Sequence, residues 1–126
     1  IRSHTNSVFS ICYTPDGTKL ITTGRDAHLK VWDVANAYQL LHNIPAHLYS
    51  INHIAFSPDA TLFATCSMDK SIKIWDVASF KLVKVIDRAR HAGHATSVNK
   101  LLWTPYKNEL VSCSDDRQIS IWEIEK

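Results

Sequence analysis

Apolar and polar residues alternate in three short stretches of the chain that share one pattern. Residues 72–76 have the sequence Ile-Lys-Ile-Trp-Asp, and the same order of apolar, polar, apolar, Trp and acidic residues occurs at 29–33 and 119–123. An alternation with a period of two predicts a half-buried β-strand in each stretch. Because the copies start at residues 29, 72 and 119, their spacing in the forties indicates a repeat architecture.

Further alternating segments surround each copy, and none has the 3.6-residue periodicity of a helix. Turn-forming residues such as Thr14-Pro15-Asp16-Gly17 separate them. The chain is therefore predicted to be all-β, with three antiparallel four-stranded units, the last lacking its outer strand. The predicted strands are 7–13, 19–24, 28–33 and 38–44 in the first unit, 50–56, 62–67, 71–76 and 80–86 in the second, and 97–103, 109–114 and 118–123 in the third.

Composition narrows the possible classes of protein. With 45% hydrophobic and 21% charged residues, the chain has the composition of a globular domain. Its net charge of +2 is too small to predict nucleic-acid binding on electrostatics alone. The sequence has neither the ~20-residue apolar run of a membrane helix nor a signal peptide, so an intracellular protein of the cytoplasm or nucleus is expected. Three cysteines lie at strand positions and are predicted to be buried free thiols.

A histidine, a hydroxyl residue, an aspartate and a tryptophan recur at matched positions in the three units. A buried Trp needs an acceptor for its indole N–H. We predict that the hydroxyl supplies it, that the imidazole contacts the hydroxyl, and that the aspartate accepts from the imidazole, at about 0.5–1.5 kcal/mol net per bond. The three sets are His4, Thr22, Asp26 and Trp32; His47, Thr65, Asp69 and Trp75; and His94, Ser112, Asp116 and Trp122.

These sets resemble the signature of the WD-repeat β-propeller family over essentially the whole chain. The resemblance implies an incomplete propeller with blade 1 at about 4–46, blade 2 at about 47–93 and blade 3 at about 94–126. The departures are mild: Ser3 and Ala46 replace the usual Gly before the His, and Glu123 replaces the last Asp. The function that it implies is a non-catalytic scaffold for protein–protein interaction, which presents loops to protein or peptide partners and needs no cofactor.

The resemblance also implies a contact face, made by the loops before each first strand and between each second and third strand. Phe9, Arg25 and Met68 are the expected energetic anchors, because aromatic residues, Arg and Met are enriched at interfaces. The full set of candidate contact residues is Ser7, Phe9, Arg25, Ser50, Asn52, Met68, Ser97, Asn99 and Asp115.

The loop at 87–95 is longer than its counterpart in the first unit and contains Arg88 and Arg90. It is either a solvated surface insertion or a basic contact for an acidic partner. Recognition of nucleic acid or of modified tails through this loop is the alternative function, although a nucleic-acid partner is less expected than a protein.

The sequence contains only weak signals for a catalytic site or a metal site. A Ser/Thr, a His and an Asp together invite comparison with a hydrolase, but a catalytic triad is a single activated set in a cleft, and here the set recurs three times beside a Trp. His91 and His94 form only an isolated pair, without the spacing of a metal site. An enzyme that uses the propeller channel is a third, weaker hypothesis; it would involve His53, which we align with Ile11 and Leu101 as a break in the repeat.

Three blades do not close a ring, since a propeller needs ~4–8. The first and third blades should each leave an apolar face open to water. We therefore expect additional blades as partners, from the same protein, from another chain or from a second copy, and we expect no membrane partner.

Overall fold

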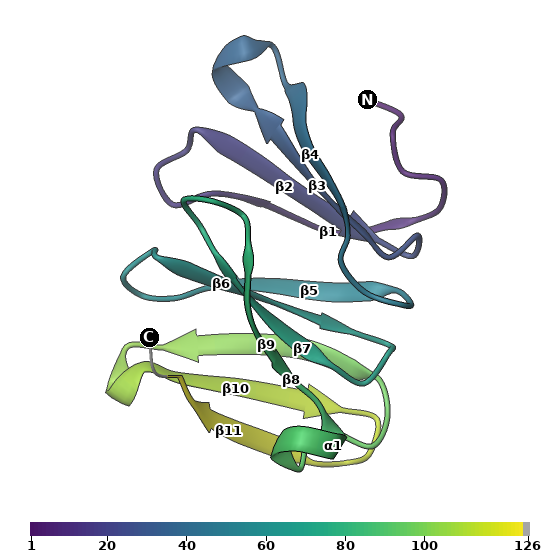
Figure 1. The fold of residues 1–126 in the computed structure, drawn as a ribbon, viewed down its shortest axis with the longest axis vertical. Coiled ribbons are helices and arrows are strands. Elements are labelled where there is room, and N and C mark those ends of the chain that lie inside the picture. The colour runs from purple at the N-terminus through teal and green to yellow at the C-terminus, as the bar shows by residue number, and fades with distance from the viewer. Residues whose placement is uncertain (125–126) are drawn as a thin grey trace.

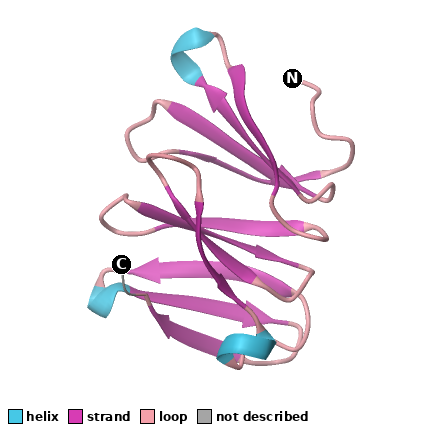
Figure 2. Ribbon diagram, viewed as in Figure 1, coloured by secondary structure: helices cyan, strands magenta, loops and turns pink. Residues whose placement is uncertain are grey.

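The computed structural model describes residues 1–124, which form three antiparallel sheets stacked one on another (Figure 1). The all-β prediction is confirmed: Figure 2 shows strands throughout the three layers and helical turns only in the connections. The first sheet has the order β1 (Val8–Tyr13), β2 (Lys19–Gly24), β3 (His28–Asp33) and β4 (Gln39–Pro45); the second has β5 (Ile51–Phe56), β6 (Leu62–Ser67), β7 (Ile72–Asp76) and β8 (Leu82–Ile86); and the third has β9 (Val98–Thr104), β10 (Glu109–Ser114) and β11 (Ile119–Glu123).

These sheets are called blades 1, 2 and 3 below. The third blade has three strands among the described residues, as predicted. The end of the third predicted unit, residues 125–126, lies outside the described residues. Consecutive blades pack through their first strands, since β1 contacts β5 and β5 contacts β9.

Short helical turns replace three of the predicted loops or strand ends. The turns are η1 (Val34–Asn36), α1 (Arg88–His91) and η2 (Tyr106–Asn108). The strand expected from residue 80 begins only at Leu82, because Phe80 takes a left-handed φ of 55°. That backbone conformation allows the Phe80 ring to pack beside Phe63 in the core.

The strand register aligns the three blades and corrects one prediction. Ile54 pairs with Thr65 as Leu101 pairs with Ser112, so the position equivalent to Leu101 is Ile54. His53 pairs instead with Cys66, and its counterpart in blade 3 is Lys100. Aligning His53 with Ile11 and Leu101 was therefore wrong by one residue. A β-bulge beside His53, between Ile51 and His53, shifts the register at that point.

Each blade has two different faces. The face that carries the Trp packs against the preceding blade: Phe63 and Trp75 of blade 2 share a buried cluster with Ile21, Leu29 and Val31 of blade 1. The opposite face packs against the following blade. On that side of blade 2, the buried cluster combines Ala64, Cys66, Ile72 and Ile74 with Val98, Leu101 and Leu110 of blade 3.

The outer faces of the stack lack the cover that the same positions have inside it. On the Trp side, Ile11 of blade 1 is 67% exposed, whereas its counterpart Ile54 is 6% exposed. On the other side, Ile121 of blade 3 is 63% exposed, whereas Val31 in the same position of blade 1 is fully buried. Inside the stack, a Trp-bearing face always meets the opposite face of the preceding blade. Blade 1 leaves a face of the first kind open, and blade 3 leaves one of the second kind open.

The three cysteines differ in their burial. Cys66 is buried between blades 2 and 3, but Cys113 is exposed and Cys12 is only half-buried. The prediction of three buried thiols was wrong for Cys12 and Cys113. Cys113 occupies the position of Cys66 on the face of blade 3 that no following blade covers, whereas Cys12 pairs with Ile21 on the face toward blade 2 and is only partly covered there.

The open faces lead to a prediction about association. At micromolar concentration, sedimentation velocity should detect species larger than the 14.3 kDa chain, because contiguous apolar sheet faces are rarely left in water. Replacing Ile119 and Ile121 by Lys should shift the distribution toward the monomer. A folded protein that sediments only at 14.3 kDa would contradict the prediction.

Candidate functional site

The structure brings the four periodic residues of each blade into one hydrogen-bonded chain. In blade 1, His4 Nδ1 lies 2.9 Å from Asp26 Oδ2, His4 Nε2 lies 2.7 Å from Thr22 Oγ1, and the Trp32 indole donates to Thr22 Oγ1 over 3.0 Å. The corresponding distances are 2.9, 2.8 and 2.9 Å for His47, Thr65, Asp69 and Trp75, and 2.9, 2.8 and 3.0 Å for His94, Ser112, Asp116 and Trp122.

The donors and acceptors fix the direction of this chain. The indole N–H can only donate, so the hydroxyl oxygen accepts from it. The single hydroxyl proton then goes to Nε2 of the histidine. Nδ1 then carries a ring proton and donates a hydrogen bond to the aspartate. The hydroxyl oxygen is thus held between the indole and the imidazole, and Thr65 and Ser112 are at most 1% exposed.

Each aspartate also ties two loops together. In blade 2, Asp69 accepts from the backbone N–H of Leu48, in the loop before β5, over 3.1 Å and from that of Ser71, in the β6–β7 turn, over 2.9 Å. The same arrangement recurs in the other blades. Asp26 accepts from Thr5 and His28, and Asp116 accepts from Ala95 and Gln118.

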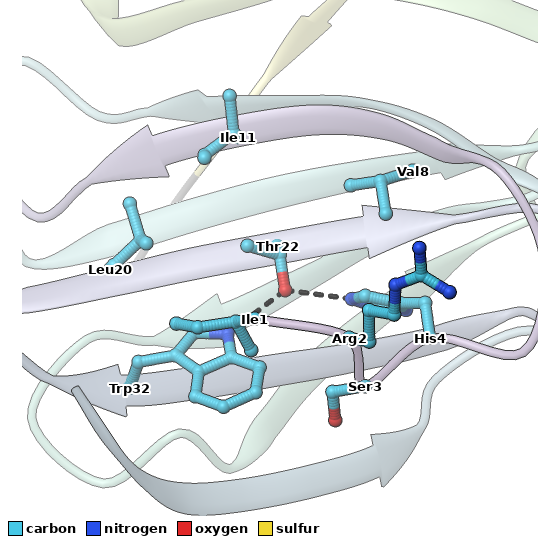
Figure 3. Close-up of a pocket in the computed structure, with 9 residues that line it drawn as sticks. All are labelled: Ile1, Arg2, Ser3, His4, Val8, Ile11, Leu20, Thr22 and Trp32. Atoms are coloured by element: carbon cyan, nitrogen blue, oxygen red, sulfur yellow. Dashed lines mark hydrogen bonds between the residues drawn. The ribbon is translucent and has the colours of Figure 1, made fainter.

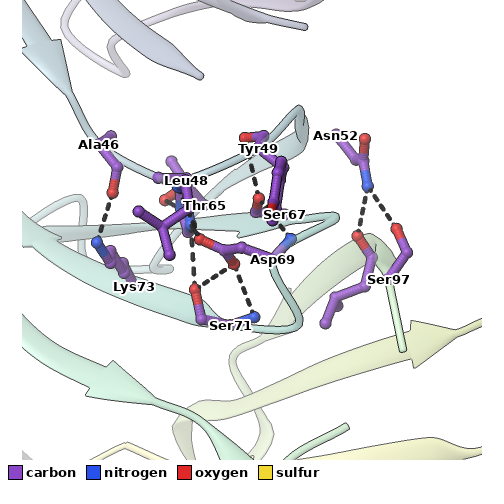
Figure 4. A network of polar contacts seen from close by, with 12 residues as sticks. Ala46, Leu48, Tyr49, Asn52, Thr65, Ser67, Asp69, Ser71, Lys73 and Ser97 are labelled. Atoms are coloured by element: carbon purple, nitrogen blue, oxygen red, sulfur yellow. Dashed lines mark hydrogen bonds and ion pairs between the residues drawn. The ribbon is translucent and has the colours of Figure 1, made fainter. Parts of the chain in front are cut away.

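Further polar contacts surround the network of blade 2 (Figure 4). Ser71 Oγ donates to Asp69 Oδ1 over 2.6 Å and lies 3.1 Å from His47 Nδ1. Across the blade boundary, the Asn52 amide donates to Ser97 Oγ and to the carbonyl of Val98. The middle of the stack is therefore fixed by polar contacts as well as by its core.

Sequence reasoning missed a second periodic contact. Lys73 Nζ donates to the carbonyl of Ala46, and Lys30 Nζ donates to the carbonyl of Ser3, so each lysine holds the residue before the network histidine. Both lysines lie two residues before the Trp, and Ser120 occupies that position in blade 3. The recurrence of Lys two residues before the Trp, at positions 30 and 73, was the sequence signal that could have revealed this contact.

Blade 3 holds its longer loop in another way. Gly93, the residue before His94, donates from its backbone to the carbonyl of Asp87, and the Asp87 side chain caps α1. A Cβ on Gly93 would lie 2.7 Å from the Asp87 carbonyl carbon, which explains why glycine is needed here.

Burial and hydrogen bonding set the charges of the network. Burial lowers the pKa of His47 despite the neighbouring Asp69, which agrees with a neutral ring. Burial by itself would raise the pKa of Asp69, but hydrogen bonds from His47 and Ser71 and the attraction of His47 bring it well below its usual range. The pKa values of Asp26 and Asp116 are lowered by similar bonds.

The network of blade 1 lies at the open end of the stack. Figure 3 shows Thr22 between Trp32 and His4, with Ile1, Arg2 and Ser3 beside them. These residues line a cavity of about 410 Å³ together with Val8, Ile11 and Leu20. Since Val8 and Ile11 are exposed while the equivalent Ile51 and Ile54 are buried, this cavity is part of the open sheet face.

The candidate contact residues fall into three groups. The exposed ones are Ser7, Phe9, Arg25, Met68, Asp115, Arg88 and Arg90. Asn52, Ser97 and Asn99 are half-buried and engaged with one another or with Asp115. Ser50 is 8% exposed and can present little surface to a partner.

Two of the exposed residues are held by their neighbours. The Arg25 guanidinium lies 5.6 Å from the centre of the Phe9 ring. Arg90 pairs with Asp87 at 3.2 Å. Among residues 1–124, no group of three or more His, Cys, Asp or Glu side chains is placed to hold a metal ion. No helix in that range could span a membrane.

The network leads to a prediction about stability. Asp69→Ala should lower the free energy of unfolding by about 1–3 kcal/mol, because it leaves the buried Nδ1–H of His47 and the backbone N–H groups of Leu48 and Ser71 without their acceptor. Chemical denaturation would measure the change, with Lys84→Ala on the exposed edge strand β8 as the control. Equal unfolding curves for the two variants would contradict the role assigned to Asp69.

The pKa shifts lead to a second prediction, about pH. His47 has a lower pKa in the folded protein than in the unfolded chain, so its contribution is complete above about pH 6.5 and is lost as the pH falls. The lowered pKa of Asp69 acts in the same direction at more acid pH. The free energy of unfolding should therefore decrease steadily from about pH 7 toward about pH 4. A stability that is flat or rises over this range would contradict the assignment.

Comparison with known proteins agrees with this geometry. The family model "WD domain, G-beta repeat" matches residues 1–33, 38–76 and 82–123. The solved structures described as "Structure of U3-55K" and "Crystal structure of RRP9 WD40 repeats" are similar to this chain, each with 26% sequence identity and a TM-score of 0.86.

Both similarities cover 98% of this chain, which spans 38% and 37% of those two structures. The three family matches cover most of the sequence, and the strand topology and the histidine-to-tryptophan networks follow the same three repeats. The chain therefore belongs to the WD40 repeat family.

Proposed function

We propose that this chain is a non-catalytic scaffold that binds protein or peptide partners on the face formed by its network-bearing loops. This face, called the loop face below, comprises residues 1–7, 46–50 and 87–97, the turns at 25–27, 68–71 and 115–118, and the first residues of β1, β5 and β9. Membership of the WD40 family supports an interaction scaffold in general, and WD40 propellers are generally non-catalytic. What we propose beyond this general role is that the loop face is the surface that binds partners.

The observation that carries the proposal is the aspartate of each blade. One carboxylate accepts backbone hydrogen bonds from both loops that form the loop face, as Asp69 does from Leu48 and Ser71. The loops are thereby held in one conformation before any partner binds. A partner then loses less of its binding free energy to the ordering of loops, which favours recognition on this face.

The exposed side chains on the loop face are of the kinds that anchor interfaces. Met68 is 56% exposed and Phe9 is 45% exposed, and Arg25 lies over Phe9. Such residues carry a large share of the binding free energy in protein complexes.

The alternative, nucleic-acid or modified-tail recognition through Arg88 and Arg90, has less support. Arg90 is paired with Asp87 of its own loop, and the net charge of the chain is only +2. Extended nucleic-acid surfaces generally carry a stronger positive field.

The two open sheet faces support a second class of partner. We propose that they are covered by further blades, supplied by the same protein, by another chain or by a second copy. A blade that meets Ile119 and Ile121 would present a Trp-bearing face, as blade 2 does to blade 1. The blade limits of about 4–46, 47–93 and 94–126 remain part of this proposal.

The proposed face predicts the outcome of a pull-down experiment. Replacing Arg25 and Met68 together by Ala should reduce recovery of bound proteins at least about tenfold, since each is expected to contribute more than ~1 kcal/mol. The control is Val83→Ala with Lys84→Ala on strand β8, which leaves the loop face unchanged. Partner sets that are equal for the two variants would remove this face from consideration.

A further inference from the structure

We propose that the hollow between blades 1 and 2 on the loop face binds a peptide segment in which a carboxylate lies next to a large apolar side chain. This inference rests on the proposed function and specifies the partner. The hollow has a volume of about 380 Å³ and is lined by Arg25, Asp26, Ala27, Leu48, Tyr49, Ser50 and Met68.

Large apolar side chains make the hollow attractive to an apolar group. Leu48 is 82% exposed and Tyr49 is 60% exposed, and both lie in the loop between β4 and β5. Met68, in the β6–β7 turn, closes the hollow from blade 2. Apolar side chains gathered around a concave site, with a few polar groups at its edge, are typical of binding sites.

The backbone around the hollow is fixed in advance. The N–H of Leu48 donates to Asp69, and Ser67 Oγ donates to the carbonyl of Tyr49 over 3.1 Å (Figure 4). Met68 N–H donates to the carbonyl of Ser50 over 2.9 Å. The exposed side chains therefore stand on a rigid frame and do not belong to a loosely held loop.

Arg25 supplies the charge at the edge of the hollow. Its backbone N–H is bonded to the carbonyl of Ser7, and its guanidinium lies over Phe9. Within residues 1–124, the guanidinium has no hydrogen-bonded or ion-paired partner. Stacking on an aromatic ring positions an Arg while leaving its N–H groups available for a carboxylate.

The carboxylates of the loop face are already in use, whereas several cations are not. Asp26, Asp69 and Asp116 are held in the networks, Asp87 pairs with Arg90, and Asp115 accepts from Asn99. Over the described part of the chain, the exposed cationic side chains of this face without an ion-pair or hydrogen-bond partner are Arg2, Arg25, Lys70, Arg88 and Arg117. Arg25, the one of these cations that lines the hollow, is thus available to a carboxylate of an incoming segment.

The equivalent position between blades 2 and 3 lacks this chemistry. There Ala95 and Thr96 stand where blade 2 has Leu48 and Tyr49, and Asp115 stands where blade 2 has Met68. The combination of apolar lining and an available Arg is therefore specific to the junction of blades 1 and 2. Since three large apolar side chains and one Arg form the site, a peptide fits it better than a polyanion such as nucleic acid, which would need a broader positive surface.

The test is a selection from a random peptide library displayed on phage, with the full chain as bait. Enriched peptides should contain Asp or Glu within two positions of a large apolar residue. The affinity of the most enriched peptide, measured by fluorescence anisotropy, should fall at least about tenfold in Arg25→Gln and in Leu48→Ser. Lys84→Gln on β8, which removes the same charge away from the loop face, should leave the affinity within about twofold.

The other outcomes separate this inference from the proposed function. Enriched peptides that are unaffected by Arg25→Gln and Leu48→Ser but weakened by Asn99→Ala would retain the loop face and overturn the hollow as the site. Enrichment of basic peptides, or stronger binding of a single-stranded oligonucleotide with steep salt dependence, would overturn the proposed partner chemistry. An absence of enrichment would count against both proposals. Unchanged thermal unfolding of each variant would show that lost binding is not lost folding.

Discussion

The hydrogen-bonded chain from the tryptophan to the aspartate is the interaction on which the rest of the structure depends. Burying an indole in the blade requires an acceptor, and each later donor in the chain requires the next acceptor until the proton of Nδ1 reaches a carboxylate. Because that carboxylate also accepts from two backbone N–H groups, the need to satisfy one buried side chain in the sheet determines the shape of the loops outside it.

The sequence repeat and the sheet do not coincide in this chain. The second family match, residues 38–76, begins with β4 of the first sheet and ends with β7 of the second. The loop that carries His47 is thus connected covalently to blade 1 and by hydrogen bonds to Asp69 and Thr65 of blade 2. Blades 1 and 2 are therefore held together by their shared core and also by the loop between β4 and β5, which the network of blade 2 fixes.

Features that recur in every repeat can be predicted from the sequence. The burial of a residue that depends on a neighbouring blade cannot. Strand order and the four network positions recur with the Trp, so periodicity was sufficient for both. The exposure of Cys113 depends on a missing following blade, and the burial of Ser50 depends on the packing of blade 1 against blade 2, and neither is encoded in a local alternation. The contact between Lys73 and Ala46 recurs in only two of the three blades. Its acceptor is a backbone carbonyl, which the pattern of side chains in the sequence does not reveal.

The loops therefore divide their positions between two tasks. Positions that repeat, such as His47 and Asp69, hold the backbone and are the same in all three blades, so they reveal the fold and say nothing of the partner. The side chains at the adjacent positions take no part in the network. Thr5, Leu48 and Ala95 follow the three histidines, and Arg25, Met68 and Asp115 precede the three aspartates. Specificity can reside only in positions that differ between blades. The residues that distinguish one junction from the next, Leu48 and Tyr49 above all, are for that reason better evidence about the partner than the motif by which the family is identified.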